Sequence, residues 1–160
     1  MEYFEIIQNK IFNYNTINAP LAYWRFKNMK IVFTNGCFDI LHRGHVEYLA
    51  KAASEGDVLI IGLNTDASVK NIKGPSRPVQ DEKSRAIILA ALSFVQAVVY
   101  FDQDTPYNLI QLIQPDVLIK GGDYKIDQIV GYDIVKDKGG IIKTIDFVPG
   151  YSTTNILNSI

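Results

Sequence analysis

The two histidines of this chain lie three residues apart in one short segment that contains glycine. Residues 34–45 read Thr-Asn-Gly-Cys-Phe-Asp-Ile-Leu-His-Arg-Gly-His, and they include both histidines of the sequence, His42 and His45. Side chains with this spacing occupy neighbouring positions on one turn of a helix. If a helix begins here, both imidazoles can approach a phosphate attracted by the helix dipole and the free N–H groups of the first turn. The segment therefore predicts a phosphate site.

The neighbours of the histidines fit the same kind of site. Gly36 and Gly44 allow the backbone to pass close to a ligand, one in the turn and the other at the helix start. The candidate nucleotide or phosphate contacts of this segment are Asn35, Gly36, Cys37, Phe38, Asp39 and Gly44.

Two other interpretations of the histidines remain open at this point. A histidine near the start of a helix is commonly a cap or a surface residue. Two histidines at this spacing can also form half of a metal site, but only Asp39 offers a further ligand nearby. The single cysteine excludes an intramolecular disulfide and a cysteine-based zinc site. The complete string, placed between a strand and a helix, favours the phosphate site.

A second group of candidates follows another apolar run, at residues 120–124. Lys120 can neutralise a phosphate, and Asp123 can accept a hydrogen bond from a ribose or a base. Gly121 and Gly122 permit close approach of the backbone. The alternative interpretation is a plain turn with a solvated lysine.

A third group consists of hydroxyl and basic side chains. Ser152, Thr153 and Thr154 begin the last expected helix, where they can act as ordinary N-caps or as part of an anion cradle. Lys73 and Arg85 belong to a basic group around a loop rich in glycine and proline, which can form a flap over the ligand. For such charges the alternative is a solvated face.

The elements that must position these residues are predicted by alternating apolar patterns. Apolar runs predict strands at 30–34, 58–63, 98–101, 116–120 and 141–145, and helices at 43–55, 82–94, 105–113, 127–138 and 152–160, with a loop-rich stretch over 64–81. Strands that are apolar throughout and are separated by helices indicate a parallel sheet covered on both faces. We therefore predict a single α/β domain over 29–160, a Rossmann-like doubly wound parallel sheet of about five strands, preceded by a helical arm over 1–28.

The composition limits the classes of partner. The formal net charge is −1, with acidic and basic residues interspersed. This balance argues against electrostatic binding of nucleic acid or of an anionic membrane. Because the sequence has neither a signal-peptide pattern nor an apolar run of membrane-spanning length, we expect a cytoplasmic protein.

The motifs together resemble a known family. The segment 34–49 carries the His-x-Gly-His signature of cytidylyltransferase-like nucleotidyltransferases, and it is similar to the adenylyltransferase half of the ADP-heptose synthases. The likeness continues through Asn64-Thr65-Asp66-Ala67-Ser68-Val69, Lys73-Gly74, Arg77-Pro78-Val79, Leu89-Ala90-Ala91-Leu92, Asp104-Thr105-Pro106, 115–124 and 150–156. It covers nearly all of the chain from Lys30 onward.

The resemblance implies a reaction and its substrates. ATP would donate AMP to D-glycero-β-D-manno-heptose 1-phosphate, giving ADP-heptose for lipopolysaccharide or related glycans, and pyrophosphate. It implies catalytic roles for His42, His45 and Lys73, Mg²⁺ carried by the triphosphate rather than by protein ligands, and a grip of residues 152–154 on the outer phosphates. It assigns no covalent role to Cys37, which we interpret as a small packing residue. Many relatives are fused to a sugar kinase, so we expect a separate kinase upstream.

Some assignments remain open. Glycerol-phosphate cytidylyltransferases have an arginine where this chain has Phe147, which weakens transfer from them. The rivals are the same chemistry on another acceptor, such as glycerol 3-phosphate with CTP, and a catalytically silent nucleotide-binding protein. We also expect a homo-oligomer, such as a dimer, because Phe4, Tyr23, Trp24 and Phe26 of the arm can cover a neighbouring subunit or their own sheet.

Overall fold

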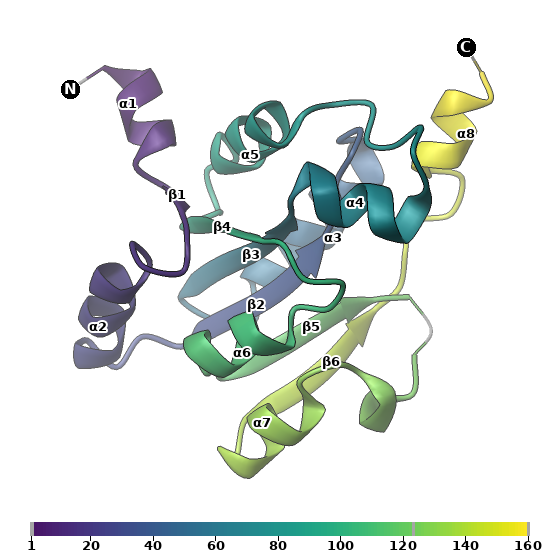
Figure 1. Ribbon diagram of the computed structural model, residues 1–160. Helices are drawn as coiled ribbons and strands as arrows, with labels where there is room; N and C mark the ends of the chain where they lie inside the picture. Colours follow the sequence, from purple (N-terminus) through teal and green to yellow (C-terminus); the bar gives the residue numbers. More distant parts are fainter. Residues whose placement is uncertain (1, 123, 160) are drawn as a thin grey trace.

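A single parallel β-sheet forms the centre of the molecule (Figure 1). The computed structural model describes residues 2–122 and 124–159. Six strands lie in the order β1-β4-β3-β2-β5-β6, and every neighbouring pair is parallel. They are β1 (Ile11–Phe12), β2 (Ile31–Gly36), β3 (Val58–Asn64), β4 (Ala97–Phe101), β5 (Val117–Gly121) and β6 (Ile141–Ile145). The chain builds outward from β2 in one direction and then, from β5, in the other. The point between β2 and β5 is therefore the topological switch point at which such sheets bind ligands.

The sheet has six strands rather than the predicted five. The additional strand, β1, comes from the segment predicted to be a helical arm, in which it lies between α1 (Tyr3–Gln8) and α2 (Asn18–Phe26). It pairs with β4 through Ile11 opposite Val98 and Phe12 opposite Val99. A strand of two residues is too short to show an apolar period, so the pairing partner and not the local sequence determines it.

Each helix predicted between residues 43 and 160 has a counterpart in the structure, and one further helix was not predicted. They are α3 (Arg43–Ala53), α5 (Glu82–Ala90), α6 (Tyr107–Ile113), α7 (Tyr132–Asp137), which follows a short 3₁₀ turn η1 (Ile126–Gln128), and α8 (Thr153–Leu157). The stretch predicted to be loop-rich contains a further helix, α4 (Asp66–Lys73). Thr65 caps it by accepting a hydrogen bond from the Ser68 N–H at 3.3 Å, and Gly74 with φ +97° ends it. The glycine and prolines that indicate a loop therefore apply only to the residues after Lys73.

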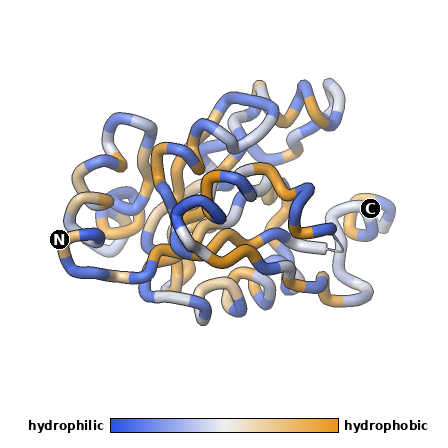
Figure 2. Tube along the Cα trace, turned by 90° about the horizontal axis from the view of Figure 1, so that it is seen from below, coloured by the Kyte–Doolittle hydropathy of each residue, from blue (hydrophilic) through white to orange (hydrophobic). Residues whose placement is uncertain are grey.

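Two apolar layers cover the sheet, one on each face. Successive strand residues point to opposite faces, so Phe33 and Ile60 pack with α2 and α6 while Val32 and Ile61 pack with α3 and α5. Figure 2 shows hydrophobic residues along the central strands and hydrophilic residues mainly in the surrounding turns and helices. Within the part of the chain that the structure describes, no helix combines the length and apolar character needed to cross a membrane.

Candidate functional site

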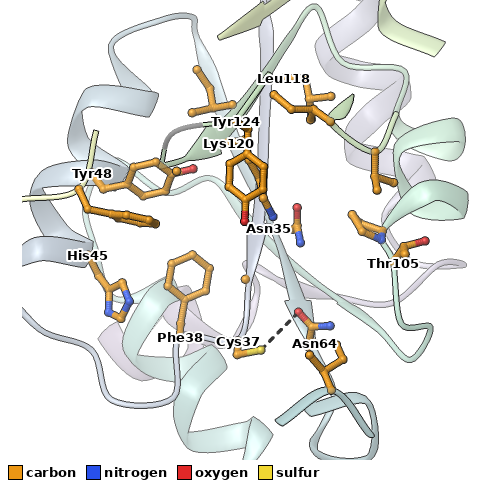
Figure 3. A pocket seen from close by; sticks show the side chains of 18 of the residues that line it. Asn35, Cys37, Phe38, His45, Tyr48, Asn64, Thr105, Leu118, Lys120 and Tyr124 are labelled. Carbon is orange, nitrogen blue, oxygen red and sulfur yellow. Dashed lines mark hydrogen bonds between the residues drawn. The ribbon is translucent and has the colours of Figure 1, made fainter. Parts of the chain in front are cut away.

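A cavity of about 520 Å³ opens at the carboxyl ends of the central strands. It lies at the switch point, and its walls come from β2, β3, β5, the start of α3 and the segment after β6. In Figure 3 the side chains of His45 and Tyr48 occupy one wall and those of Asn64 and Thr105 the opposite one, with Asn35 and Lys120 between them. The predicted site residues that line it are Asn35, Gly36, Cys37, Phe38, Asp39, His45, Lys73, Lys120, Gly121 and Thr153.

The two histidines meet at the N-terminus of α3. His42 is the N-cap residue, with extended φ −134° and ψ 171°, and its side chain makes no capping hydrogen bond. Its ring stacks on that of His45, with 3.8 Å between the ring centroids and 21° between the planes. The Nδ1 atoms of both rings are buried and have no hydrogen-bond partner among the described residues. Buried polar atoms are nearly always satisfied, so this pair is suited to a ligand or to water.

Gly44 explains how the stacked pair fits into the helix start. A Cβ at this position would lie 3.0 Å from His42 Cε1 and 3.0 Å from Tyr151 Cβ. The glycine therefore permits the His42 ring and the segment before α8 to approach the first turn together. Gly44 itself is buried, and it acts through this packing rather than by lining the cavity.

The stacked imidazoles are neutral at pH 7 in the absence of a ligand. Burial, followed by the proximity of His42, lowers the pKa of His45 to about 4. Burial also lowers the pKa of His42. A neutral imidazole donates one hydrogen bond and accepts another, so the pair offers directed hydrogen bonds rather than charge. A bound triphosphate would raise both pKa values by stabilising the charged form.

The turn after β2 gives His45 its second aromatic neighbour. Phe38 adopts φ 44°, in the left-handed region, and its ring meets that of His45 edge-on with 5.3 Å between centroids. A Cβ on Gly36 would lie 2.9 Å from the Phe38 ring, so only glycine leaves room for this turn. Cys37 is half-buried, with Sγ 3.9 Å from Asn64 Oδ1, and burial raises the pKa of its thiol despite nearby positive charges. A thiol with a raised pKa is a poor nucleophile, in agreement with its interpretation as a packing residue.

Two of the predicted phosphate contacts, Arg85 and Asp39, make hydrogen bonds within the protein. Arg85 is 1% exposed and lies behind the cavity wall. Its guanidinium donates to the carbonyl oxygens of Cys37 at 2.6 Å and Asn64 at 2.9 Å, and pairs with Asp66 at 2.7 Å. Asp39 borders the cavity, but its carboxylate accepts hydrogen bonds from a neighbouring loop. Sequence patterns show charge but not burial, so they could not separate these residues from exposed ligand contacts.

Two lysines also border the cavity. Lys120, at the end of β5, is half-buried, and burial lowers the pKa of its ammonium group. Its Nζ lies 5.6 Å from the centroid of the Tyr124 ring. Gly121 is required beside it because a Cβ would lie 2.6 Å from Phe147 Cε1. Lys73, the last residue of α4, is exposed and borders the cavity from another side.

The remaining predicted residues are divided between the cavity and its surroundings. Ser152 caps α8 by accepting from the Asn155 N–H at 3.0 Å, which is the ordinary N-cap role. Thr153 lines the cavity, whereas Ser152, Thr154 and Gly122 do not appear in its wall. Asp123 lies outside the described residues.

Several lining residues were not among the predicted contacts. Asn64 and Thr105 stand at or after the carboxyl ends of β3 and β4, so the rule that ligands gather at strand ends identifies them. Tyr48 follows His45 by one helical turn, and its hydroxyl lies 2.6 Å from the Thr34 hydroxyl. Burial raises the pKa of Tyr48 to about 12. An apolar helix face predicts only a core residue at this position.

A protein-bound metal has little support from the described residues. In the segments 2–122 and 124–159, no group of three or more histidine, cysteine or acidic side chains is placed to hold a metal ion. The stacked rings are also oriented face to face, whereas two imidazoles that share a metal ion direct ring nitrogens toward it. The site is a cavity at the switch point of a Rossmann-like sheet, the position at which such sheets bind ligands.

Comparison with known proteins places the chain in a family. Residues 33–158 match the model of the family described as cytidylyltransferase-like. The chain belongs to the cytidylyltransferase-like family of nucleotidyltransferases.

Relatives with a common name share about half of its residues. A protein named bifunctional protein HldE from Methylobacillus flagellatus is 53% identical over 152 residues, which are 95% of this chain and 31% of that protein. A protein of the same name from Rhodopseudomonas palustris is 56% identical over 141 residues, 88% of this chain and 29% of that protein. The chain therefore spans about a third of the length of these relatives.

Solved structures share the fold. A lipopolysaccharide core biosynthesis protein from Thermoplasma volcanium superposes with a TM-score of 0.62 at 27% identity, over 75% of this chain and 97% of that one. A pantoate-beta-alanine ligase from Francisella tularensis superposes with a TM-score of 0.60 at 18% identity, over 93% of this chain and 76% of that one. The second likeness concerns the fold alone.

Proposed function

We propose that this protein transfers AMP from ATP to D-glycero-β-D-manno-heptose 1-phosphate, giving ADP-heptose and pyrophosphate. The observation that carries the proposal is the stacked pair of imidazoles, with unpartnered Nδ1 atoms, at the N-terminus of α3 in the cavity. The relatives named HldE support the choice of substrate, because about half of this chain is identical to them.

The proposed reaction does not require a general base. A phosphate monoester has its second pKa near 6, so the acceptor is largely dianionic at pH 7 and needs no deprotonation. One of its oxygens attacks the α-phosphorus of ATP in line. The bond from that phosphorus to the bridging oxygen breaks, and pyrophosphate leaves with the electron pair. The site has to align the reactants and to stabilise the charge that develops on the α-phosphate and the leaving group.

The residues of the cavity divide these tasks. His45, which lines the cavity, donates a hydrogen bond to the reacting phosphate, and His42 behind it supports the orientation of the ring. Lys73 and Lys120, which also border the cavity, offset the negative charge of the two substrates. The first-turn amides of α3 add the partial positive charge of a helix N-terminus.

We propose that Mg²⁺ enters with the triphosphate. The described residues hold no cluster of three or more potential ligands, whereas phosphate oxygens are the hard ligands that Mg²⁺ prefers. When bound, the ion would withdraw charge from the phosphates. The protein's own task is then to position the complex of ATP and Mg²⁺ against the histidine pair.

A substrate panel tests the proposal. ATP, CTP, GTP and UTP are each incubated with Mg²⁺ and either the heptose 1-phosphate or glycerol 3-phosphate, and pyrophosphate release and product mass are measured. We expect release with ATP and the heptose 1-phosphate, with the mass of ADP-heptose. Turnover with CTP and glycerol 3-phosphate would assign the other acceptor, and ATP binding without turnover on either acceptor would make the protein a silent nucleotide-binding domain.

The proposed reaction also places the protein in a cytoplasmic context. Its acceptor has to come from a reaction that phosphorylates a sugar at carbon 1, so we propose a sugar kinase as the preceding enzyme. Both ATP and the phosphorylated sugar are cytoplasmic metabolites in this scheme. An assay that couples a heptose kinase to this protein, followed by mass measurement, tests the order of the two steps.

We further propose a homodimer that uses the outer face of α2. Ile17 and Leu21 face the core and are 0% and 2% exposed, whereas Tyr23 and Phe26 are 57% and 81% exposed. Ala19, Tyr23 and Phe26 form a stripe along α2 with a small residue at its beginning and aromatic residues at its end, and the Lys27 Nζ lies 5.9 Å from the centroid of the Tyr23 ring. Two such helices packed antiparallel about a two-fold axis would place small residues opposite large ones, which makes the stripe self-complementary.

One helix face is smaller than a stable interface, which requires about 800 Å² from each partner. The exposed Tyr3 and Phe4 of α1, on the other flank of β1, would contribute the rest (Figure 1). Light scattering should give twice the monomer mass for the unchanged chain and the monomer mass for Phe26→Glu. The surface variant Lys51→Glu on α3 is the control. A monomeric unchanged chain would contradict the dimer without affecting the reaction.

A further inference from the structure

Asp39 accepts three hydrogen bonds, all from the loop that joins α4 to α5. Arg77 Nε donates to its carboxylate at 2.6 Å, and the backbone N–H groups of Val79 and Gln80 donate at 2.8 Å and 2.9 Å. The Asp39 side chain is 1% exposed and that of Arg77 is 17% exposed. The carboxylate therefore fastens this loop to the turn that follows β2.

Lys73 stands immediately before the same loop. It is the last residue of α4, and Gly74 ends the helix with φ +97°. The N–H of Arg77 then returns to the carbonyl oxygen of Gly74 at 3.2 Å, which closes a short turn. Because this turn is compact, the position of Arg77 constrains the end of α4 and with it the backbone that carries Lys73 beside the cavity.

The other side of Asp39 adjoins the histidine pair. Its neighbour Phe38 has φ 44°, a conformation that is costly for a residue with a side chain. The Phe38 ring contacts that of His45 edge-on. Asp39 thus lies between a strained turn that supports His45 and a loop that carries Lys73, which are the two groups that have to face the reacting phosphates together.

Loss of the ion pair between Asp39 and Arg77 should change the position of this loop. Burial by itself raises the pKa of Asp39, but the hydrogen bonds from Gln80 and Val79, together with Arg77, bring the net pKa below the ordinary value. The carboxylate is therefore charged in the folded protein. Removal of Arg77 leaves that buried charge without its counter-ion, and the loop has to shift to admit water.

We propose that Asp39 and Arg77 are positioning residues that hold Lys73 at the wall of the cavity that His45 also lines, and that they do not themselves contact the substrates. This inference rests on the proposed function, because it assigns Lys73 a part in the reaction. Asp39, which the sequence suggests as a phosphate contact, acts in this scheme through the loop. Arg77, which the sequence presents only within the segment Arg77-Pro78-Val79, is its partner.

A double-mutant cycle separates positioning from simple structural support. Arg77→Ala should lower kcat/KM by up to roughly tenfold, because a misplaced Lys73 loses no more than its removal would. In a Lys73→Ala background the same substitution should change kcat/KM by less than about threefold, because coupled residues give non-additive effects. Arg77→Lys, which keeps the charge, should recover part of the activity. If the losses of the two single variants multiply in the double variant, Arg77 and Lys73 act independently and the proposal is overturned.

Hydrogen exchange supplies a readout that needs no substrate. In Arg77→Ala and Asp39→Asn, the amides of Val79 and Gln80 should exchange faster than in the unchanged protein, while those of β3 remain protected. Lys143→Ala, which removes the surface pair with Glu55, is the matched control and should leave the loop unchanged. If the amides of Val79 and Gln80 keep their protection in both Arg77→Ala and Asp39→Asn, the proposal is overturned. If Arg77→Ala fails to fold, Asp39→Asn, which is nearly isosteric, carries the cycle.

The two tests also distinguish the inference from the proposed function. If the unchanged protein shows no turnover on the substrate panel, the proposed function is refuted. Faster exchange of the Val79 and Gln80 amides in the variants would still show that Asp39 and Arg77 hold the loop. An active protein in which Arg77 and Lys73 act independently refutes the positioning role and leaves the function intact.

Discussion

The two sides of the cavity present positive character to a ligand in different ways. At the start of α3, His42 and His45 are stacked, half-buried and neutral, and they act with the dipole of a helix. Elsewhere on the wall, Lys73 and Lys120 are ammonium groups on long side chains, one exposed and the other half-buried. Packing holds the two imidazoles in place. The ion pair of Asp39 and Arg77, which fastens the loop after Lys73, and the Tyr124 ring beside Lys120 help to place the lysines.

This difference indicates a division of labour. Neutral, packed donors cost little reorganisation and direct hydrogen bonds to one place, as in an oxyanion hole. Charged lysines act over a longer range and draw two anionic substrates together, but salt screens them. The histidine side should therefore determine the rate of the chemical step, and the lysine side should contribute more to the capture of substrates.

The largest effect should follow from the removal of His45. We expect His45→Ala to lower kcat by at least about a hundredfold, comparable to the loss of one oxyanion-hole donor. Steady-state kinetics with ATP and the heptose 1-phosphate measure this, and circular dichroism checks that the variant is folded. Near-normal turnover of a folded variant would remove His45 from the catalytic machinery.

A smaller effect with a different salt dependence should follow from the removal of Lys73. We expect Lys73→Ala to lower kcat/KM by roughly tenfold at low salt, and the difference from the unchanged protein should shrink as salt is added because screening weakens its charge. The loss in His45→Ala should depend much less on salt, since a neutral donor is removed. Equal salt dependence in the two variants would contradict the division between the two sides.

The neutral state of the histidine pair predicts the pH dependence of stability. The pKa of folded His45 is about 4, below the value near 6.5 expected for an unfolded chain. Between these values the unfolded state binds more protons, so stability falls as the pH decreases from about 6.5 to about 4 and is level above that range. Thermal unfolding midpoints from pH 4 to pH 8 test this. His45→Gln should flatten the profile, and an unchanged slope would show that His45 does not cause it.

The smallest effect should follow from Tyr48→Phe, which removes a hydroxyl near the histidine side. The Thr34 hydroxyl, 2.6 Å away, would lose its buried partner. We expect a loss of about 1 kcal/mol in the free energy of unfolding, the usual value of such a bond. Urea unfolding measures it. A change much below that value would mean that water replaces the missing hydroxyl.

The central part of the fold could be predicted from the sequence because its signals are local. The strands β2 to β6 appear as apolar runs, and the helices between them have apolar faces that repeat with the helical period. The strand β1 could not be predicted, since Ile11 and Phe12 form a strand only because β4 lies beside them. The helix α4 was missed because the glycine and prolines after Lys73 dominate the pattern of its region.

The candidate site shows the same division. The histidines of residues 34–45 lie in one segment, and the helix turn that brings their rings together is itself local. Arg85 was assigned to the phosphates on its charge, yet it is buried against carbonyl oxygens from two strand ends. Its carbonyl partners, Cys37 and Asn64, lie 48 and 21 positions away in the sequence, and no local pattern reports these contacts.

The sequence by itself thus determined the strands β2 to β6, the turn with its two histidines and the family, because each depends on neighbouring residues or on a contiguous motif. Only the tertiary structure decided which charges face the cavity and which are used within the protein. Asp39 and Arg77 are separated by many positions and form one ion pair. Burial and pairing depend on the packing of distant segments, and packing rather than residue type decides whether a charged group is available to a ligand.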